Sequence, residues 1–514
     1  MTRWYRQYCS LFQLLRRSHC ITTQIEFEIG RSVMPRRLLP YLMSTIGLWI
    51  LWTQMTGSAL AIEKQPTAFI HANLIPMTTA TVLFDHTVVV EGKQITVVGP
   101  SNDTEIPDNA NVINCRNAFL MPGLSDMHMH LRYSWISDAW PVSPLKLYIA
   151  NGVTTIRCFG PGGKTGKYGL NWQKDIDAGR LVGPSILTCG PMLGGHFKKD
   201  PEQIVIKQKY QRFDFIKIYS YVTKEEYHTI LATAKKLNIY TAGHIPFQVG
   251  LDGVLAEGMD EIAHIEEFLW EFSDLDRQRY FENKEAWMAY AVQTTFDRFA
   301  PFLELNPQEK EQKLEVLVAT ILDKLKDRQI PVCTTLVVDD LIEQKLFYPE
   351  QFLRKPENRF LPAGYLDRFR KGKEKHQMQF KGGEVFAPFK YMLDKKLLVG
   401  LKKINIPLLL STDAGTGRMG IVPGFSIHDE LRILVENGFT PYEAIAAGTI
   451  VASGIVKRMN GQDDFGTIVP GKRADLILLQ KNPLEDVANV RKISGVMAAG
   501  QWYDQKAIAE MLGN

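Results

Sequence analysis

Short apolar runs separated by turn residues characterise both ends of the chain. Between Thr67 and Val112, β-branched and apolar runs alternate with Gly, Pro and Asn turns. The same pattern returns in Gly466–Leu479 and in Val496–Tyr503. Runs of this kind predict β-strands. We therefore expect one small β-sandwich domain built from both termini, with residues 62–121 and 461–514 as its two parts.

The middle of the chain alternates strand-like with helix-like segments. This order predicts parallel strands that are joined by helices. With the strand before His128 there are about eight strand-like segments, the number that a TIM barrel requires. We expect an α/β fold with a distorted TIM (β/α)8 barrel over residues 122–460. The other predicted strands are Thr154–Phe159, Ser185–Cys189, Phe215–Tyr219, Tyr240–His244, Glu261–His264, Pro331–Thr335 and Ile406–Asp413.

One part of the predicted barrel is much longer than a single β/α unit needs. Residues from about 270 to 403 are rich in charged and aromatic side chains. This composition and length predict a helical insertion, and we expect it to cover the mouth of the barrel.

The first 61 residues have the composition of a leader. Met34-Pro-Arg-Arg precedes the apolar run Leu38–Met55, and Ala59-Leu-Ala61 follows. A basic start, an apolar centre and a small-residue exit are the parts of a secretory signal peptide. We expect residues 34–61 to be removed on export to the periplasm or outside the cell, and residues 1–33 to be an extension that is not translated if Met34 is the true start. The alternative is an uncleaved membrane anchor, because the apolar run approaches the ~20 residues that a spanning helix needs.

The basic excess of the sequence is confined to this leader. The whole chain has a formal net charge of +4, and residues 1–61 contribute +5 from seven arginines and two glutamates, so the remainder carries −1. A body without basic excess does not favour nucleic acid. The expected partner is a small-molecule substrate, with membrane contact only through an uncleaved leader, and a homo-oligomer is left open. The cysteines beyond the leader have no C-x-x-C spacing, which favours buried free thiols over disulfides.

The segment Phe119–His130 joins an apolar run to Pro-Gly and ends in two histidines with one residue between them. Side chains alternate faces along a strand, so His128 and His130 point the same way. Two imidazoles on one side of a strand end can hold one divalent cation. Taken alone, the pair is explained equally well as a polar patch at a strand terminus.

Later predicted strands also end in residue types that bind metals. Lys217, His244, His264 and Asp413 each lie at or near a strand end. Catalytic groups of a β/α barrel come from the C-terminal ends of different strands and converge on one face. Each residue has an individual structural explanation, such as a hydrogen-bonded buried histidine or a helix-capping aspartate. Several of them in order on successive strands instead indicate a site.

These residues, together with Met121-Pro-Gly-Leu-Ser-Asp126, resemble the metal-dependent amidohydrolase superfamily, in its imidazolonepropionase-like and Xaa-Pro dipeptidase-like branch with a carbamylated lysine. Ser426–Leu431 resembles the family's helix after the eighth strand, and Gly466–Leu476 resembles its return into the β-domain. The resemblance covers nearly all of the chain after the leader. It implies a binuclear centre of two divalent metal ions, with zinc as the expected metal.

The resemblance also implies a role for each ligand. The first two histidines would hold one ion, the last two would hold the other, the lysine carbamate would bridge both, and the aspartate would complete the first site. A hydroxide between the ions would attack the amide, because such ions lower the pKa of bound water to about 7. The aspartate would act as general base and then as general acid. The implied ligands are His128, His130, Lys217, His244, His264 and Asp413.

Apolar neighbours make Lys217 suited to this role, since a buried ammonium is costly and a neutral amine can take up carbon dioxide. An ion pair with Asp413 is the alternative.

Four further residues are candidates for substrate binding. His196 matches a family position that contacts substrate, with a loop histidine as the alternative. Tyr219 and Tyr221 can donate to a substrate carboxylate or oxyanion, unless they only pack the barrel. Arg157 is a further carboxylate partner, for which a structural salt bridge is the alternative. The family often has an aspartate where this chain has Cys158, which leaves the local substrate contacts open.

The leading hypothesis is a secreted metal-dependent amidohydrolase that cleaves the C–N bond of a dipeptide or an N-acyl amino acid. A cyclic-amide hydrolase acting on a lactam or imidazolone uses the same chemistry and is the first alternative. The second is a catalytically inactive scaffold with the amidohydrolase fold. The intact ligand set argues against a scaffold, because the fold alone does not require it.

Overall fold

The computed structural model describes residues 65–132, 140–160, 166–195, 197, 199–371, 383–415 and 419–513. The predicted leader, residues 1–33 and 34–61, lies outside the described residues, and so does His196. Gln65–Asn514 form one compact unit. Within the described parts of the chain, no helix combines the length and the apolar character needed to cross a membrane.

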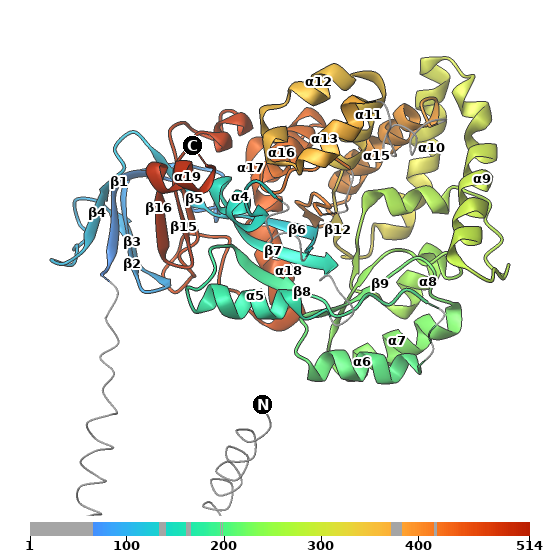
Figure 1. Ribbon diagram of the computed structural model, residues 1–514, viewed down its shortest axis with the longest axis horizontal. Helices are drawn as coiled ribbons and strands as arrows, with labels where there is room; N and C mark the ends of the chain where they lie inside the picture. Colours follow the sequence, from blue (N-terminus) through green and yellow to red (C-terminus); the bar gives the residue numbers. More distant parts are fainter. Residues whose placement is uncertain are drawn as a thin grey trace, which may run out of the picture. The chain divides into compact units, whose positions relative to one another are not determined.

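Both ends of this unit contribute strands to one β-sheet (Figure 1). The sheet has the order β16-β15-β14-β5-β1-β2-β3, and β4 pairs with β1. The antiparallel pairing of β14 with β5 joins the two ends. The strands are β1 Thr67–Leu74, β2 Leu83–Glu91, β3 Gln94–Pro100, β4 Asn111–Asn114, β5 Phe119–Pro122, β14 Leu476–Leu479, β15 Ile493–Ala498 and β16 Gln501–Asp504.

The predicted sandwich takes the form of a single sheet that curls around its own core. A bridge between Gln94 and Arg473, and a hydrogen bond from Ile95 N–H to Lys472 O at 2.8 Å, connect β3 to the segment before β14. Apolar side chains of both chain ends fill the interior, among them Phe69 and Leu476. The curl therefore removes this apolar face from water, which is the main favourable term for such a domain.

Eight parallel strands follow one another through the middle of the chain. They form two hydrogen-bonded sheets, of order β6-β7-β8 and β13-β12-β11-β10-β9. All eight coincide with segments that the sequence predicts as strands. They are β6 Leu124–His130, β7 Val153–Gly160, β8 Ser185–Thr188, β9 Phe215–Ile218, β10 Tyr240–Gly243, β11 Glu261–Ile262, β12 Val332–Cys333 and β13 Leu408–Leu409.

The two sheets meet at both edges. Cys189, directly after β8, forms a parallel bridge to Phe215 of β9. At the other edge, the N–H of Met127 in β6 donates to Leu410 O at 2.9 Å, directly after β13. These contacts complete a ring in sequence order, so the predicted distorted TIM barrel is confirmed.

Helices connect successive barrel strands. Their N-termini carry local signals, as in α7, where Thr223 and Glu226 form a capping box that satisfies the first backbone N–H groups. The connecting helices are α4 Pro144–Ala150, α5 Tyr168–Asp177, α6 Pro201–Tyr210, α7 Lys224–Lys236, α8 Gly250–Glu257, α16 Ser426–Glu436, α17 Pro441–Ala447 and α18 Ile450–Asn460, and α19 Gln505–Met511 ends the chain.

The predicted insertion at about 270–403 is divided in two by strand β12. The first part follows the 3₁₀ helix η2, and its helices form the edge of the unit farthest from the β-domain (Figure 1). The second part lies between β12 and β13. The elements are η2 Ile265–Glu271, α9 Lys284–Leu303 and α10 Pro307–Leu325, then α11 Val337–Phe347, α12 Pro349–Arg354, η3 Pro356–Phe360, α13 Ala363–Arg370 and α15 Phe386–Lys403.

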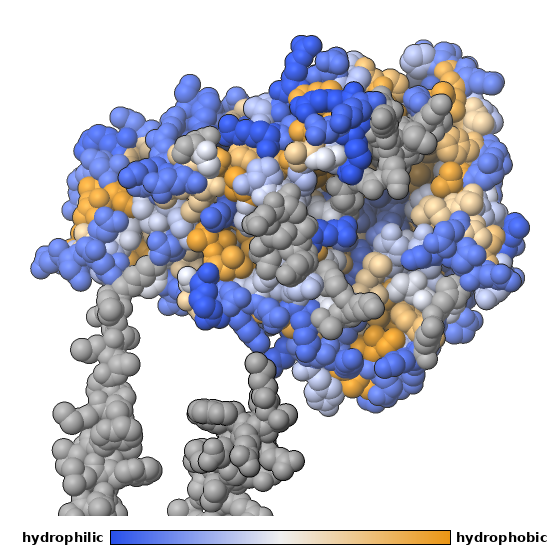
Figure 2. Space-filling view, viewed as in Figure 1, coloured by the Kyte–Doolittle hydropathy of each residue, from blue (hydrophilic) through white to orange (hydrophobic). Residues whose placement is uncertain are grey.

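The surface on the face shown in Figure 2 is mainly hydrophilic, with separate apolar patches. Single exposed aromatic side chains such as Phe84 and Tyr210 occur on the described residues. Scattered exposure of this kind is normal for a folded domain.

Candidate metal centre

Two histidines occupy the C-terminal end of β6. His128 is fully buried, and its ring stacks on Phe159 of β7 with a centroid distance of 3.9 Å. His130 is partly exposed, and its ring lies 5.4 Å from that of His128. Gly160 makes this arrangement possible, because a Cβ at that position would clash with the His130 ring. The neighbouring strand β7 therefore contacts the His128 ring and leaves room for the His130 ring.

Asp413 approaches this pair from the end of β13. Its Oδ1 lies 3.0 Å from Nε2 of His130 and 3.5 Å from Nε2 of His128. Its backbone N–H donates to His128 O at 2.8 Å. The residue has a φ of 56°, in the left-handed region that aspartate tolerates better than most residues. Backbone and side chain together hold the carboxylate against both rings.

The histidines that follow β10 and β11 complete the group. The ring of His264 lies 4.2 Å from that of His128, and the ring of His244 lies 5.1 Å from that of His264. Nδ1 of His264 is 3.1 Å from Thr335 Oγ1. One ligand atom each from His128, His264 and Asp413 all lie within 4.8 Å of one another. The barrel thus brings residues that are far apart in sequence to one point.

Lys217 of β9 is 1% exposed and points into the same region. Its Nζ lies 4.7 Å from the centre of the Phe159 ring and has no hydrogen-bond partner among the described residues. Burial lowers the pKa of the lysine to about 8. The negative charge of Asp413 opposes this lowering, so an ion pair between Lys217 and Asp413 stays an alternative.

The polar atoms of this cluster suit divalent cations. Burial holds the pKa values of His128, His244 and His264 well below the usual range, so their imidazoles are neutral and keep a lone pair for a metal. Both ring nitrogens of His128 are buried without a hydrogen-bond partner in the described structure. A buried polar atom left in this way is costly, and a bound cation would satisfy it. Neutral imidazoles with a carboxylate are typical zinc ligands.

A family sequence model matches the C-terminal part of the chain. Residues 396–503, which include β13 and Asp413, match the sequence model of the amidohydrolase family.

Over these residues the chain is similar to the amidohydrolase family.

Several solved structures share the fold of this chain. A candidate prolidase from Bifidobacterium longum is 22% identical, with a TM-score of 0.58, and the match covers 88% of this chain and 99% of that one. A Xaa-Pro dipeptidase with methionine bound in its active site is 19% identical, with a TM-score of 0.57 and coverage of 86% and 100%. The ochratoxinase of A. niger is 18% identical, with a TM-score of 0.55 and coverage of 86% and 96%. A search of curated protein sequences finds no match.

Asp126 supports the candidate ligands His128 and Asp413 from beneath, a role that the sequence motif did not reveal. Its fully buried carboxylate accepts from the Tyr148 hydroxyl at 3.0 Å and from the backbone N–H of Thr412 at 3.1 Å. Thr412 directly precedes Asp413, and Asp126 lies two residues before His128. Burial raises the pKa of Asp126 to about 7, against these hydrogen bonds. One carboxylate therefore ties the ends of β6 and β13 together.

The substrate-binding role predicted for Arg157 is wrong. Its guanidinium is fully buried inside the barrel, where Nη1 donates to Glu261 Oε2 at 2.8 Å and Nη2 pairs with Oε1 of the same residue. Its Nε donates to Met127 O at 2.8 Å. Each of its three nitrogens thus donates to a group of the protein, and the cation supports the strands below the candidate metal cluster.

Replacement of Arg157 by methionine is expected to lower the free energy of unfolding by about 3–5 kcal/mol, since it leaves a carboxylate buried and unpaired. Urea denaturation of the metal-free protein measures this. The double variant Arg157→Met with Glu261→Gln should recover part of the loss. Arg180→Met breaks an exposed pair with Asp175 and serves as the control, with a change of about 0–1 kcal/mol. Equal stability of Arg157→Met and the control would contradict the assignment.

The two tyrosines remain candidates for substrate binding. The ring of Tyr219 lies 4.2 Å from that of His244, and Tyr221 lies 5.6 Å from Tyr219. Partial burial raises the pKa values of both hydroxyls, so they stay protonated and can donate hydrogen bonds. Tyr221 also contacts Phe247, which begins an aromatic cluster of the insertion.

The four cysteines of the described residues are buried free thiols, as predicted: Cys115, Cys158, Cys189 and Cys333.

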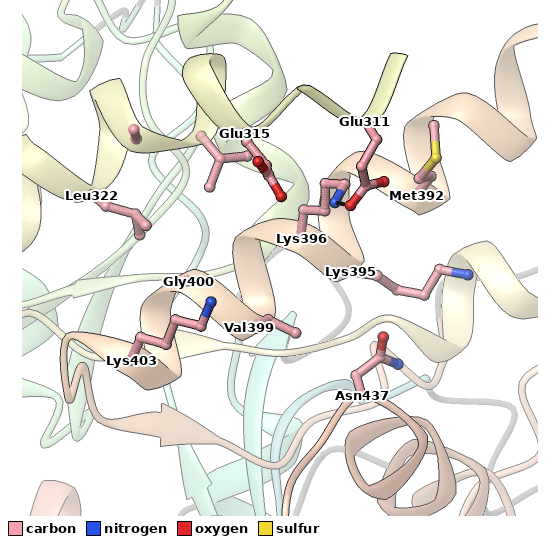
Figure 3. Close-up of a pocket in the computed structure, with 12 residues that line it drawn as sticks. Glu311, Glu315, Leu322, Met392, Lys395, Lys396, Val399, Gly400, Lys403 and Asn437 are labelled. Atoms are coloured by element: carbon pink, nitrogen blue, oxygen red, sulfur yellow. Dashed lines mark hydrogen bonds and ion pairs between the residues drawn. The ribbon is translucent and has the colours of Figure 1, made fainter. Parts of the chain in front are cut away.

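A cavity of about 460 Å³ lies away from the metal cluster, between α10 and α15 (Figure 3). Leu322, Val399 and Gly400 line its apolar part. Lys396 reaches across it to pair with Glu311. None of the predicted site residues lines this cavity, so it is separate from the candidate active site.

Proposed function

We propose that this amidohydrolase hydrolyses the C–N bond of a small amide with a free carboxylate, such as a dipeptide or an N-acyl amino acid. The observation that carries the proposal is the convergence of His128, His264 and Asp413 within one buried cluster. Solved structures of similar fold include a Xaa-Pro dipeptidase and a bottromycin amidohydrolase. These likenesses support the proposal that the substrate bond is of the amide type.

The proposed cofactors are two divalent ions, with zinc as the expected metal. The two histidines of β6 and Asp413 would hold one ion, the histidines after β10 and β11 would hold the other, and the carbamate of Lys217 would link them. Such ions supply hydroxide at neutral pH and polarise the amide carbonyl. The buried, partnerless Nζ of Lys217 supports the carbamate, since two additional oxygens would give this position metal ligands.

Asp413 is placed to move the proton of the reaction. Its carboxylate accepts the proton of the attacking water as the oxygen adds to the carbonyl carbon. It then passes that proton to the departing nitrogen as the C–N bond breaks, which yields a free carboxylate and an amine. Its Oδ1 lies 3.0 Å from Nε2 of His130 and 3.5 Å from Nε2 of His128, so the carboxylate is already at the centre of the cluster.

The hydroxyls of Tyr219 and Tyr221 are the proposed donors to the substrate, together with His196. Without Arg157, these neutral or weakly basic groups must orient the substrate carboxylate. A carboxylate held beside the scissile bond would turn the carbonyl toward the nucleophile, so its loss should lower turnover as well as binding.

A substrate panel tests this proposal. Metal-loaded protein is assayed on dipeptides and N-acyl amino acids, on their C-terminal amides, and on lactams. We expect the free acids to exceed the amides in kcat/KM by about tenfold or more, which corresponds to about 1.4 kcal/mol. Equal kcat/KM values for the free acids and the amides would contradict the proposal that the site binds a substrate carboxylate.

The burial of Arg157 favours a cyclic-amide hydrolase as the second candidate. A lactam or imidazolone carries no separate carboxylate, so it needs no cationic partner beside the metals. Turnover of lactams above that of every linear substrate would select this function.

We further propose export of the protein, with only a small-molecule partner. The support is the basic, apolar and Ala-x-Ala order of residues 34–61. N-terminal sequencing of the native protein should find Ile62 near the mature start, whereas an intact residue before Leu60 would favour a membrane anchor.

A further inference from the structure

A carboxylate outside the predicted ligand set contacts one of the ligands. Oε1 of Glu267, on η2, lies 2.6 Å from Nδ1 of His244. Its Oε2 accepts from the backbone N–H of Ile245 at 3.1 Å. The side chain of Glu267 is 4% exposed. One buried carboxylate therefore holds both the imidazole ring and the backbone directly after it.

This contact sets which ring nitrogen of His244 faces the protein. Glu267 and Ser220 both lie against Nδ1, so Nε2 is the nitrogen left for a metal ion. The hydroxyl of Ser220 lies 2.9 Å from the same Nδ1 and can turn its oxygen toward it. Metal-binding histidines commonly donate their second N–H to a carboxylate, which fixes the ring and raises its basicity.

The residue before Glu267 connects η2 to the helical insertion. Oε2 of Glu266 lies 3.1 Å from Nζ of Lys390 on α15. The same ammonium lies 2.8 Å from Asp339 of α11 and 2.8 Å from Asp394 of α15. Elements η2, α11 and α15 thus meet at one cation. Because Glu266 and Glu267 are adjacent on η2, the pairing of Glu266 also restricts the position of Glu267.

We propose that Glu267 is a positioning residue for the metal ligand His244, and that the ion pair between Glu266 and Lys390 lets the insertion support it. The inference rests on the proposed function, since it requires His244 to bind a divalent ion. The insertion then helps to retain the metal, in addition to any cover that it gives to the barrel mouth.

Replacement of Glu267 by glutamine tests the inference in the full chain. The substitution keeps the shape of the side chain and removes its charge. We expect the affinity for the more weakly held Co²⁺ or Zn²⁺ ion to fall about 10- to 100-fold in chelator competition. The visible spectrum of the Co²⁺ form should shift, and kcat should fall more than KM rises. If the variant does not fold, Glu267→Asp takes its place, because it keeps the charge but shortens the reach to Nδ1.

Two variants separate positioning from general stability. Glu271 is also buried on η2, but it pairs with Arg277 at 2.9 Å, so Glu271→Gln should keep the metal affinity within about twofold. Glu266→Gln breaks only the link to Lys390 and should weaken metal binding less than the Glu267 variant does. A wild-type protein that binds no divalent ion would refute the proposed function. A wild type that binds two ions, with Glu267→Gln unchanged in affinity and spectrum, would overturn the positioning role alone.

Discussion

Replacement of Asp413 by asparagine is expected to remove nearly all hydrolytic turnover while the protein stays folded. The amide has the same shape as the carboxylate, and asparagine tolerates the left-handed backbone of this position. It cannot accept and release the proton, and positioned proton transfer contributes about 10²- to 10⁴-fold to rate. We therefore expect kcat to fall by at least ~10³-fold, because the variant also loses a charged metal ligand.

The measurement combines steady-state kinetics with circular dichroism and metal analysis. Asp340→Asn is the matched control, since Asp340 is also a largely buried aspartate but pairs with Arg432 at 3.2 Å, outside the cluster. This control should keep its turnover within about twofold of the wild type. If Asp413→Asn retains more than a tenth of the wild-type kcat, Asp413 is not the group that moves the proton.

Replacement of Lys217 by alanine is expected to have the second large effect. We expect this effect to be most direct in the metal content of the protein. Without a carbamate to join the two ions, the protein should hold about one ion or fewer per chain instead of two, and activity should be lost. Short carboxylates, or bicarbonate with them, should restore part of both, because they supply two oxygens to the space that the side chain leaves. Plasma emission analysis of the dialysed protein gives the ion count.

A second buried lysine provides the control for this variant. Lys345 of α11 is 1% exposed, and burial lowers its pKa to about 7. Lys345→Met should affect stability but leave the metal content unchanged, since this lysine lies outside the cluster. Full metal loading of Lys217→Ala would refute the bridging role. An unmodified ammonium paired with a carboxylate in a metal-loaded crystal would refute the carbamate.

Local sequence patterns determined the order of the elements and the identity of the side chains that converge on the candidate metal centre. Barrel strands are short apolar runs between turn residues, and this signal survives even where the paired part is as short as β13. The candidate ligands follow these runs directly, so their convergence follows from the parallel arrangement of the strands. His128, His264 and Asp413 were therefore predictable without any knowledge of long-range contacts.

Tertiary structure alone decided which polar partners these side chains have. Arg157 has the same local signature as a substrate-binding residue at a strand end, but its partner Glu261 lies 104 residues away. The link from Asp126 to Thr412 spans 286 residues, and it forms only because β13 returns to β6. The partners of a buried charge depend on where the barrel closes, and nothing in the spacing along the chain carries that information.

The helical insertion gives another example of a feature that the sequence predicted only in part. Its charged and aromatic composition predicted helices, but not that η2 would turn Glu267 toward His244 or that α15 would bring Lys390 to Glu266. Adjacent glutamates on a polar segment are usually solvated, so no local rule singles them out. Burial makes the difference, because a carboxylate removed from water must find a donor or a cation, and only the folded chain brings one within reach.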